Sequence, residues 1–425
     1  MNQFDNSMEW LTRAEQTIPL GSQTFSKSKM SVPLGAAPLY VKEARGAHFT
    51  DVDGNEYLDF VNGLLCVNLG YQDKDVDAAI RQQMASGITF SLPHVIEAEL
   101  AEMLVELIPC AEMVRFGKNG SDATSAAIRI SRAFTQREHI AVCGYHGWQD
   151  WYIGSTTRDL GVPESTKQLT HKFIYNDIDS LKRLFEREDK PLAAVIMEPM
   201  NIEPPKPGFL QAVKALCERH NSVLIFDEMI TGFRFHNGGA QAYFGVTPDL
   251  ATFGKGMANG MPISALVGKK DIMLKMNDVF FSGTFGGETL SLAAAKASLT
   301  KLQRENVVDH IWQKGQYLID GFKQINPDIE YFDIKGLAPW SFLHIENGKH
   351  SSALHIKSWL IQEMCQKGIY FIGTHNLSFA HTLDDIDYLL ACYKELLSRA
   401  IEIDREEDIG SHLTGSPIEN VFKVR

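Results

Sequence analysis

Short apolar runs alternate with helical patterns through the middle of the chain, from about residue 112 to 300. The predicted strands are Met113–Phe116, Ile140–Cys143, Ala193–Met197, Val223–Phe226, Leu250–Phe253 and Ser264–Val267. Predicted helices between them include Ser121–Phe134, in which Ala123 and Ala127 begin one apolar face, and Gly208–His220. Alternation of this kind is typical of a mainly parallel sheet covered by helices on both faces. We therefore predict an α/β fold for this region.

The flanking regions are mixed in character. At residues 47–60, alternating apolar and polar positions surround the turn Asp53-Gly54-Asn55, which predicts a β-hairpin. Further helices are predicted at Ser7–Glu15, Ala78–Met84, Glu97–Leu107 and Thr382–Ala400. The last stretch, Ile401–Arg425, is charged and rich in turn-forming residues, so we predict a tail that drapes over a neighbour.

Composition narrows the class of protein. A chain of 425 residues with 44% apolar and 22% charged residues is typical of a soluble globular enzyme of two or three domains. A formal charge of −12 argues against a nucleic-acid partner, and no apolar run approaches the roughly 20 residues of a membrane span. The first residues lack the basic and apolar regions of a secretion signal, so we expect a cytoplasmic protein. The six cysteines are scattered without a Cys-x-x-Cys pair, which predicts free thiols rather than a metal site or disulfides.

Polar residues follow the ends of the predicted strands, where ligands bind in open parallel sheets. The segment Gly-Lys-Asn-Gly-Ser-Asp-Ala at 117–123 leads into a helix, and its backbone amides and the Ser121 hydroxyl suit an anion. The alternative is an ordinary helix cap made by Ser121 or Asp122. The segment Gly-Tyr-His-Gly-Trp at 144–148 offers aromatic rings on which a flat ligand could stack, although aromatic clusters more often belong to the core.

Charged residues end the next two strands. Asp227 and Glu228 follow one of them, and acids in that position are usually functional or paired because an unpaired buried charge is costly. Lys255 follows the other between Gly254 and Gly256, a pattern that on its own is most often a surface turn. Together, however, a phosphate cradle, a stacking ring, a carboxylate and a lysine are the groups that pyridoxal 5′-phosphate (PLP) requires. The lysine forms a Schiff base with the aldehyde, and the carboxylate keeps the pyridine nitrogen protonated so that the ring withdraws electrons.

From about Ile18 to Ala400 the chain resembles the class III aminotransferases of PLP fold type I, and among them the glutamate-1-semialdehyde 2,1-aminomutases. The most specific motif is Leu-Ile-Phe-Asp-Glu-Met-Ile-Thr-Gly-Phe-Arg at 224–234, followed by Thr-Pro-Asp at 247–249 and Gly254-Lys255. The resemblance implies a large domain with a mainly parallel seven-stranded sheet, and a small α+β domain built from N- and C-terminal segments. The expected divisions are an N-terminal segment at 1–70 that packs on the small domain, a PLP-binding domain at 71–310, the small domain at 311–400 and the tail at 401–425.

The resemblance also assigns roles to site residues. Lys255 becomes the Schiff-base lysine, Asp227 the partner of the pyridine nitrogen, and Met229 the contact behind the ring. The remaining residues expected to bind the cofactor are Gly120 and Ser121 at the phosphate, Tyr145 stacked on the ring, His146, Glu198, and Thr284. Because the family's threonine completes the phosphate site of the other subunit, the resemblance implies a homodimer.

Departures from the aminomutases bear on the reaction. Lys27 falls where those enzymes have an arginine for the substrate carboxylate, Leu64 replaces an aromatic residue, and Gly373 falls near the position of a glutamate. The gating loop is shortened at Trp151–Gln168. An aminomutase must retain its intermediate behind a closing loop, so these losses favour a simple aminotransferase. We predict transfer from a donor, expected to be L-glutamate, to an aldehyde or ketone by a ping-pong mechanism through pyridoxamine phosphate.

The substrate residues are predicted from what the chain lacks. No arginine lies between Arg304 and Arg399, where many aminotransferases bind the carboxylate of the amino donor. We therefore expect Lys27, Lys29 or Arg234 to bind that carboxylate. The segment Gly-Thr-His-Asn-Leu-Ser at 373–378 led to two hypotheses, that His375 and Asn376 face a sugar-like carbonyl compound or that a surface loop caps the small domain. Three rival functions are the aminomutase itself, a catalytically silent scaffold of the same fold, and nucleotide binding. Nucleotide binding fails because glycine, not serine or threonine, follows Lys255.

Overall fold

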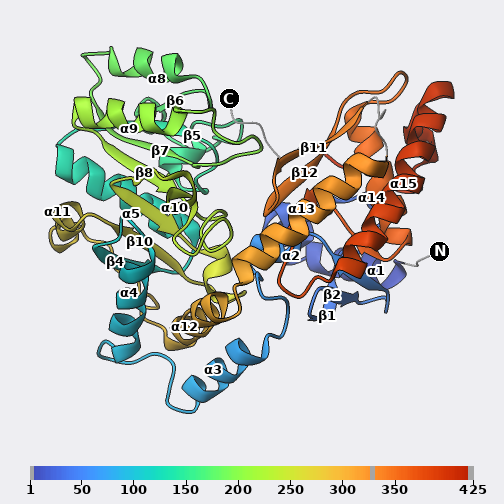
Figure 1. The fold of residues 1–425 in the computed structure, drawn as a ribbon, viewed down its shortest axis with the longest axis horizontal. Coiled ribbons are helices and arrows are strands. Elements are labelled where there is room, and N and C mark those ends of the chain that lie inside the picture. Colours follow the sequence, from blue (N-terminus) through green and yellow to red (C-terminus); the bar gives the residue numbers. More distant parts are fainter. Residues whose placement is uncertain (1–3, 326–330, 420–425) are drawn as a thin grey trace. The chain divides into compact units, whose positions relative to one another are not determined.

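The computed structural model describes residues 4–325 and 331–419, which form two compact units (Figure 1). Unit 1 contains the described residues up to Leu64, residues Asn68–Gln72, and those from Asp309 onward. Unit 2 contains Leu65–Val67 and Asp73–Val308. None of the helices among the described residues is long and apolar enough to cross a membrane.

Unit 2 is built on a seven-stranded sheet with the order β4-β10-β9-β8-β7-β5-β6. Its strands are β4 (Met113–Gly117), β5 (His139–Cys143), β6 (Thr170–Lys172), β7 (Leu192–Met197), β8 (Val223–Asp227), β9 (Leu250–Phe253) and β10 (Ser264–Gly268). The strands from β9 through β6 pair in parallel, and β10 runs antiparallel to both of its neighbours. All six residues of β7 are buried, as expected of a strand covered on both faces. The predicted α/β fold is therefore confirmed.

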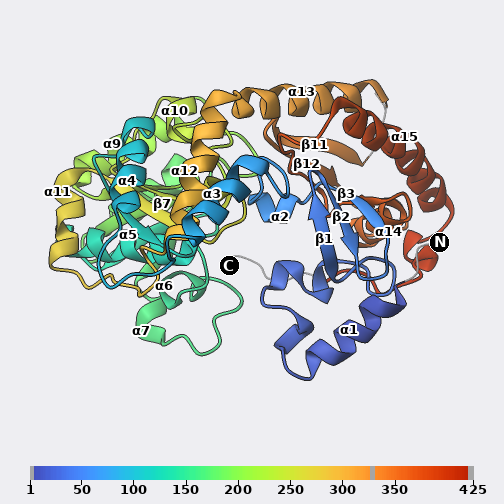
Figure 2. The same cartoon turned by 90° about the horizontal axis from the view of Figure 1, so that it is seen from below.

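Helices cover both faces of this sheet, with α5 on one side and α9 and α12 on the other (Figure 2). The helices of unit 2 are α3 (Lys74–Met84), α4 (Val95–Leu107), α5 (Gly120–Thr135), α6 (Asp150–Ile153), α7 (Glu164–Lys167), α8 (Ile178–Phe185), α9 (Phe209–His220), α10 (Ala240–Phe244), α11 (Lys270–Met273) and α12 (Thr289–Arg304). The start of α5 is fixed by a capping box, in which Asn119 Oδ1 accepts from the amide of Asp122 while the Asp122 carboxylate accepts from the amide of Asn119.

Unit 1 contains two smaller sheets. One has the order β1-β2-β3-β13 and includes the predicted hairpin, and the other has the order β11-β12-β14. The strands are β1 (Val41–Arg45), β2 (His48–Asp51), β3 (Glu56–Asp59), β11 (Phe332–Leu337), β12 (Trp340–Ile345), β13 (Ile369–Tyr370) and β14 (Thr374–His375). The longer helices are α1 (Asp5–Glu15), α13 (Val307–Ile325, which begins in unit 2), α14 (Ala353–Gln366) and α15 (Leu383–Glu406). The buried faces of α13, α14 and α15 form a core around Trp359 and Tyr393.

The predicted C-terminal tail is in large part folded structure. Helix α15 continues to Glu406, beyond the predicted end at Ala400, and a turn of 3-10 helix follows at Ile409–His412. Ile418 is buried in a cluster of unit 1 with Phe4 and Val32. The tail therefore contributes to the core of its own unit as far as it is described, and residues 420–425 lie outside the described part.

A four-residue turn, α2 (Asn62–Leu65), has left-handed backbone angles throughout. The φ angles of Asn62, Gly63, Leu64 and Leu65 are 55°, 58°, 61° and 69°. Three of these residues carry a Cβ, so the conformation is strained. The amides of Val61 and Asn62 donate to Asp59 Oδ1 at 2.8 and 3.0 Å, which holds the entrance to the turn.

Candidate active site

A cavity of about 610 Å³ in unit 2 brings together most of the predicted cofactor residues. It lies where strands of the large sheet end, as expected for an open parallel sheet. The predicted residues that line it are Gly120, Ser121, Tyr145, His146, Glu198, Asp227, Met229 and Lys255. Residues from five separate segments of the chain therefore meet at one site.

The N-terminus of α5 forms one wall and presents unpaired amide groups. The capping box occupies the amides of Asn119 and Asp122. The amides of Gly120 and Ser121 donate to no acceptor within the described chain. The Ser121 hydroxyl accepts a hydrogen bond from the amide of Trp148 at 3.3 Å, which turns it toward the same place. Two free amides at the start of a sixteen-residue helix make an anion site.

Glycines keep this wall open. Gly147 has a φ of 103°, and a Cβ at this position would collide with Ser121 Oγ. A Cβ at Gly120 would lie 3.0 Å from Met229 Sδ, and one at Gly254 would lie 2.8 Å from the same atom. Any larger residue at these positions would displace the groups that line the cavity.

Asp227 is buried and held by three partners. His146 Nδ1 lies 2.8 Å from Asp227 Oδ2, while the amide of Met229 and the hydroxyl of Thr252 donate to Oδ1, each at 3.2 Å. His146 Nε2 lies 3.1 Å from the carbonyl oxygen of Cys143 and must donate a proton to it. His146 therefore links the Asp227 carboxyl group to the backbone of Cys143.

Lys255 begins a short 3-10 helix directly after β9, with a φ of 41°. Burial lowers the pKa of its amine, an effect partly opposed by the Cys66 thiol and by the carboxylates of Glu198 and Asp227. A lowered pKa increases the neutral fraction of the amine, which is the nucleophilic form. The surface turn that the Gly-Lys-Gly pattern favours on its own is not what the structure has.

Glu198 and Tyr145 complete the site. Burial raises the pKa of Glu198 to about 7, with His146 opposing and Asp227 adding to the rise. Its Oε2 accepts from the amide of Tyr145 at 3.1 Å and from Asn201 Nδ2 at 2.9 Å. The Tyr145 ring is half exposed at the cavity and meets the Tyr152 ring edge-on, at 5.6 Å between centroids, so it could stack on a flat ligand.

The neighbouring acid, Glu228, has a different role. It is fully buried and accepts from the Thr231 hydroxyl at 2.7 Å and from the amides of Ala240 and Gln241 at 2.5 and 2.9 Å. It is absent from the cavity lining. Glu228 therefore fastens the loop after β8, and of the two predicted acids only Asp227 reaches the site.

The other predicted residues lie elsewhere. Thr284 is exposed on unit 2 and does not line this cavity. Lys27, Lys29 and Leu64 line a separate cavity within unit 1, where Lys29 pairs with Glu15 at 2.5 Å. Arg234 is fully buried in unit 2, away from the lining, and burial lowers its pKa to about 9.

His375 and Asn376 are buried within unit 1. The two ring nitrogens of His375 lie 2.9 Å from Ser341 Oγ and 2.7 Å from the Tyr393 hydroxyl. Asn376 Nδ2 donates to the carbonyl of Val61 at 2.9 Å, next to the left-handed turn. This arrangement favours a structural role for both residues over the predicted contact with a sugar-like substrate, and equally over a surface loop.

Several lining residues were not named as site residues from the sequence, among them Lys118 and Cys66. Lys118 follows β4 and pairs with Glu288 at 2.9 Å, and Cys66 comes from the short segment Leu65–Val67. Lys118 stands in the predicted strand-end segment and could have been named from it. Cys66 follows no predicted strand, so no sequence signal marks it.

The donor set fits PLP. The free amides of Gly120 and Ser121 would hold the phosphate, Tyr145 and Met229 would enclose the ring, Asp227 would face its nitrogen, and Lys255 would attach it. When bound, PLP supplies an electron sink for charge that develops on the substrate. The residues around it orient the site: His146 holds the Asp227 carboxyl group in place, and Lys255 accepts and returns protons as an amine of lowered pKa.

Comparison with known proteins identifies the family of this chain. Residues 30–390 match the Aminotransferase class-III family. A 3-aminobutyryl-CoA aminotransferase of Cloacimonas acidaminovorans is 35% identical over 405 residues, which are 92% of this chain and 96% of that protein. A glutamate-1-semialdehyde 2,1-aminomutase of Alkaliphilus oremlandii is also 35% identical, over 92% of this chain and 98% of its own.

A solved structure shares the fold. The FumI protein of Sphingopyxis sp. MTA144, determined with PLP, superposes with a TM-score of 0.87 at 27% identity, over 96% of this chain and all of that one. The family match covers most of the chain, and its motif residues gather around one cavity. The chain therefore belongs to the class III aminotransferases and is a PLP-dependent transaminase.

Proposed function

We propose that this transaminase moves an amino group from L-glutamate to an aldehyde or ketone acceptor in two half-reactions, and that it is not an aminomutase. The relatives include both kinds of enzyme at the same identity, so overall similarity does not separate them. The observation that carries the proposal is the compact segment between β5 and β6.

That segment is tied down along its length. Trp151 Nε1 donates to Ser125 Oγ at 2.9 Å, and the hydroxyl of Thr170 donates to the carbonyl of Trp151. Lys167, the last residue of the short helix α7, pairs at 2.9 Å with Asp159, which precedes that helix. An aminomutase must hold its intermediate through both half-reactions, which a closing loop achieves. A short, fastened segment instead suits an enzyme that releases its first product before the second substrate enters.

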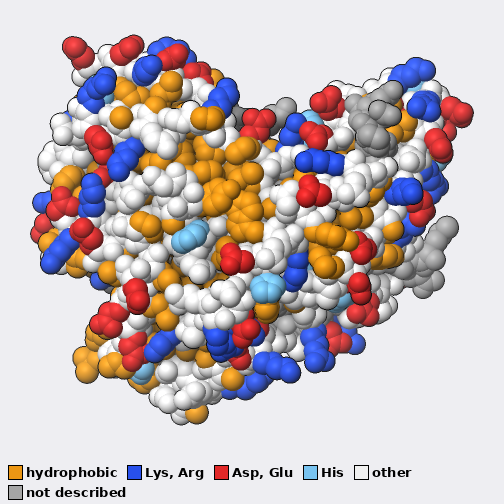
Figure 3. Space-filling model, in the orientation of Figure 1, with side chains coloured by type: hydrophobic (Ala, Val, Ile, Leu, Met, Phe, Trp, Pro, Cys, Tyr) orange, Lys and Arg blue, Asp and Glu red, His pale blue; other side chains and the backbone are white. Residues whose placement is uncertain are grey.

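We further propose a homodimer. Thr284, the residue that the family resemblance gives to the other subunit's phosphate site, is exposed, with Phe280 and Phe285 exposed beside it in sequence. Leu92 and Val95 are also exposed, and hydrophobic side chains lie on the surface of the loop between α3 and α4 (Figure 3). Exposed apolar residues of this kind suit burial against a second copy.

The reaction is tested with ¹⁵N-labelled L-glutamate and a panel of aldehydes and ketones. We expect 2-oxoglutarate to form with each turnover and the label to appear in the aminated acceptor. Glutamate-1-semialdehyde, offered without a donor, should not be isomerised. Isomerisation of that compound together with absence of label transfer would assign the chain to the aminomutases. Turnover that persists in Lys255→Ala would instead contradict the site.

A further inference from the structure

A turn at Gly283–Gly286 lies on the surface of unit 2, between α11 and α12 (Figure 2). The amide of Gly286 donates to the carbonyl of Gly283 at 3.0 Å, so Thr284 and Phe285 occupy the two corners of a β-turn. Both corner residues are exposed, and within the described chain the Thr284 hydroxyl forms no hydrogen bond. The turn therefore presents a hydroxyl group that its own chain does not use.

Two arginines hold the chain just before this turn. Arg115 of β4 donates from Nη2 to the carbonyl of Phe281 at 2.8 Å, and Arg129 of α5 donates from Nη1 to the carbonyl of Phe280 at 3.0 Å. Neither arginine forms an ion pair with another of the described residues. Because the acceptors are backbone oxygens, these bonds fix the path of the chain and not the orientation of a side chain.

An ion pair holds the chain just after the turn. Lys118, which follows β4, lies with its Nζ 2.9 Å from Glu288 Oε2. Glu288 also caps α12, since its carboxylate accepts from the amides of Leu290 at 2.7 Å and Ser291 at 3.3 Å. The side chains of Lys118 and Glu288 are only 23% and 13% exposed, so solvent screens this pair less than a pair on the open surface. The turn thus lies between two fixed ends.

The elements that hold the turn also form the anion site of unit 2. The capping box at the start of α5 leaves the amides of Gly120 and Ser121 free, and Asp122 Oδ2 in that box also accepts from the amide of Lys118 at 2.9 Å. A phosphate group has three outer oxygens that are strong hydrogen-bond acceptors. Two amides and the Ser121 hydroxyl leave part of this capacity unfilled, so a donor supplied by a second copy of the chain would strengthen the binding.

We propose that the three cations at β4 and α5 are positioning residues for a cofactor site in a second copy of the chain. They hold the turn so that the Thr284 hydroxyl donates to the phosphate of PLP bound to that copy. The inference rests on the proposed homodimer and names the residues that prepare its shared site. A hydroxyl on a turn with fixed ends loses little conformational freedom when it binds, which raises the affinity for the phosphate. The positioning residues are Arg115, Lys118 and Arg129.

The test compares the affinities of the full-length protein for PLP and for pyridoxal, which has the same ring and aldehyde without the phosphate. Equilibrium dialysis after removal of the resident cofactor gives both dissociation constants. We expect Arg129→Met to weaken PLP binding about fivefold and to leave pyridoxal binding unchanged, because only the phosphate meets the threonine. Arg132→Met is the matched control, because Arg132 lies on the same helix and donates to the carbonyl of Glu138 at 2.8 Å, outside the turn. It should change neither affinity.

The threonine itself provides the second arm of the test. Thr284→Val should weaken PLP binding about ten- to a hundredfold, because it removes a hydrogen bond to a charged group, and should leave pyridoxal binding unchanged. In the Thr284→Val background, Arg129→Met should have no further effect, because the arginine acts through the threonine. Thr284 is exposed, so we expect this variant to fold, and sedimentation velocity should find every variant to be a dimer.

Three results would each overturn the inference: equal effects of Arg129→Met and Arg132→Met, equal weakening of PLP and pyridoxal binding, or additive losses in the double variant. A loss of PLP affinity that accompanies dissociation into monomers would also overturn it. A monomeric wild-type protein would refute the proposed homodimer, and the inference with it. A dimeric Thr284→Val protein with wild-type PLP affinity would refute the inference alone. Label transfer from ¹⁵N-labelled L-glutamate tests the proposed reaction independently of these outcomes.

Discussion

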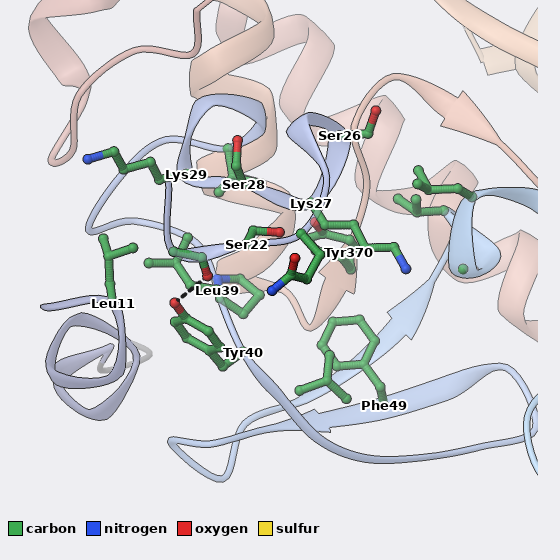
Figure 4. Close-up of a pocket in the computed structure, with 18 of the residues that line it drawn as sticks. Leu11, Ser22, Ser26, Lys27, Ser28, Lys29, Leu39, Tyr40, Phe49 and Tyr370 are labelled. Carbon is green, nitrogen blue, oxygen red and sulfur yellow. Dashed lines mark hydrogen bonds between the residues drawn. The ribbon is translucent and has the colours of Figure 1, made fainter. Parts of the chain in front are cut away.

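The cavities of the two units differ in how they treat charge. In unit 2, Lys255, Asp227, His146 and Glu198 crowd one cavity, and each has an ionisable neighbour within it. In unit 1, the cavity beside α1 is mostly apolar (Figure 4), and its Lys29 is paired with Glu15. Buried ionisable groups that lie close together shift one another's pKa values, which suits them to proton transfer. A mostly apolar cavity with few charged groups suits the binding of a ligand instead. The same chain thus contains a site built for reaction and one suited to recognition.

The largest effect should come from Lys255. We expect Lys255→Ala to lower transamination at least about 10⁴-fold, because the variant loses both the covalent attachment and the proton carrier. Borohydride reduction of the holoprotein followed by mass spectrometry should find no cofactor linked to the variant. Lys270→Ala, an exposed lysine on unit 2, is the matched control and should keep wild-type turnover. Retained turnover in Lys255→Ala would contradict the assignment of the unit 2 cavity as the site of reaction.

Substitutions of the adjacent acids Asp227 and Glu228 should have different effects, the first on activity and the second on stability. Asp227→Asn keeps the shape but not the charge, and we expect turnover to fall about 10²- to 10³-fold with little change in the free energy of unfolding. Glu228→Gln replaces an acceptor of several hydrogen bonds by a partial donor, and should cost about 2–4 kcal/mol of unfolding free energy. Steady-state rates and denaturant titrations of both variants check this. Similar profiles for the two would contradict the assignment of only one acid to the site.

Gly147 should control affinity for the cofactor. In Gly147→Ala the added methyl group collides with Ser121 Oγ, and we expect PLP to bind about ten- to a hundredfold more weakly because the anion site must shift. Gly161 has a similar backbone angle, with a φ of 88° against 103°, but open space around its missing Cβ. Gly161→Ala therefore reports backbone strain alone. Equal losses of PLP in the two variants, measured by fluorescence titration, would show that strain and not the cradle sets the affinity.

The smallest effect should be the pH response of Glu198. Its pKa is raised to about 7 from an ordinary 4.5, so between these values the folded state holds a proton that the unfolded chain has released. Stability from this group is therefore lost as pH rises from 4.5 to 7, by roughly 1–3 kcal/mol. Glu198→Gln should lack that loss and gain stability over the wild type between pH 5 and pH 8. Parallel pH profiles in urea denaturation would show that Glu198 is already ionised when folded.

The sheet of unit 2 was predictable because each strand is a short apolar run with a turn after it. All six predicted strands are present within one residue of their ends, and β9 matches at both ends. Strand β6 was missed because three residues, Thr170–Lys172, are too short and polar to stand out. The end of α15 was placed too early because its last turns are charged, although Ile401 and Asp404 are buried.

The candidate site was predictable where residues follow strands and unpredictable where they depend on the rest of the chain. Asp227 and Lys255 end strands of one sheet, so topology alone places them together. Asp227 and Glu228 have different roles because their side chains point in different directions, and the sequence alone does not predict those directions. The polar segment around His375 predicts a side chain that can contact a substrate, yet both of its ring nitrogens lie within hydrogen-bond distance of Ser341 and Tyr393.

The left-handed turn at Asn62–Leu65 has a consequence for how the sequence can vary. Each residue with a Cβ in that conformation costs about 1–2 kcal/mol, so glycine at residue 64 would stabilise the fold. Asp59 and Asn376, which bond to Val61 and Asn62, offset the cost of keeping side chains there. A leucine in a strained left-handed conformation suggests that the contacts of its side chain matter more than the backbone strain. The unfolding free energy of a Leu64→Gly variant should therefore show whether backbone strain or side-chain contact weighs more at this position.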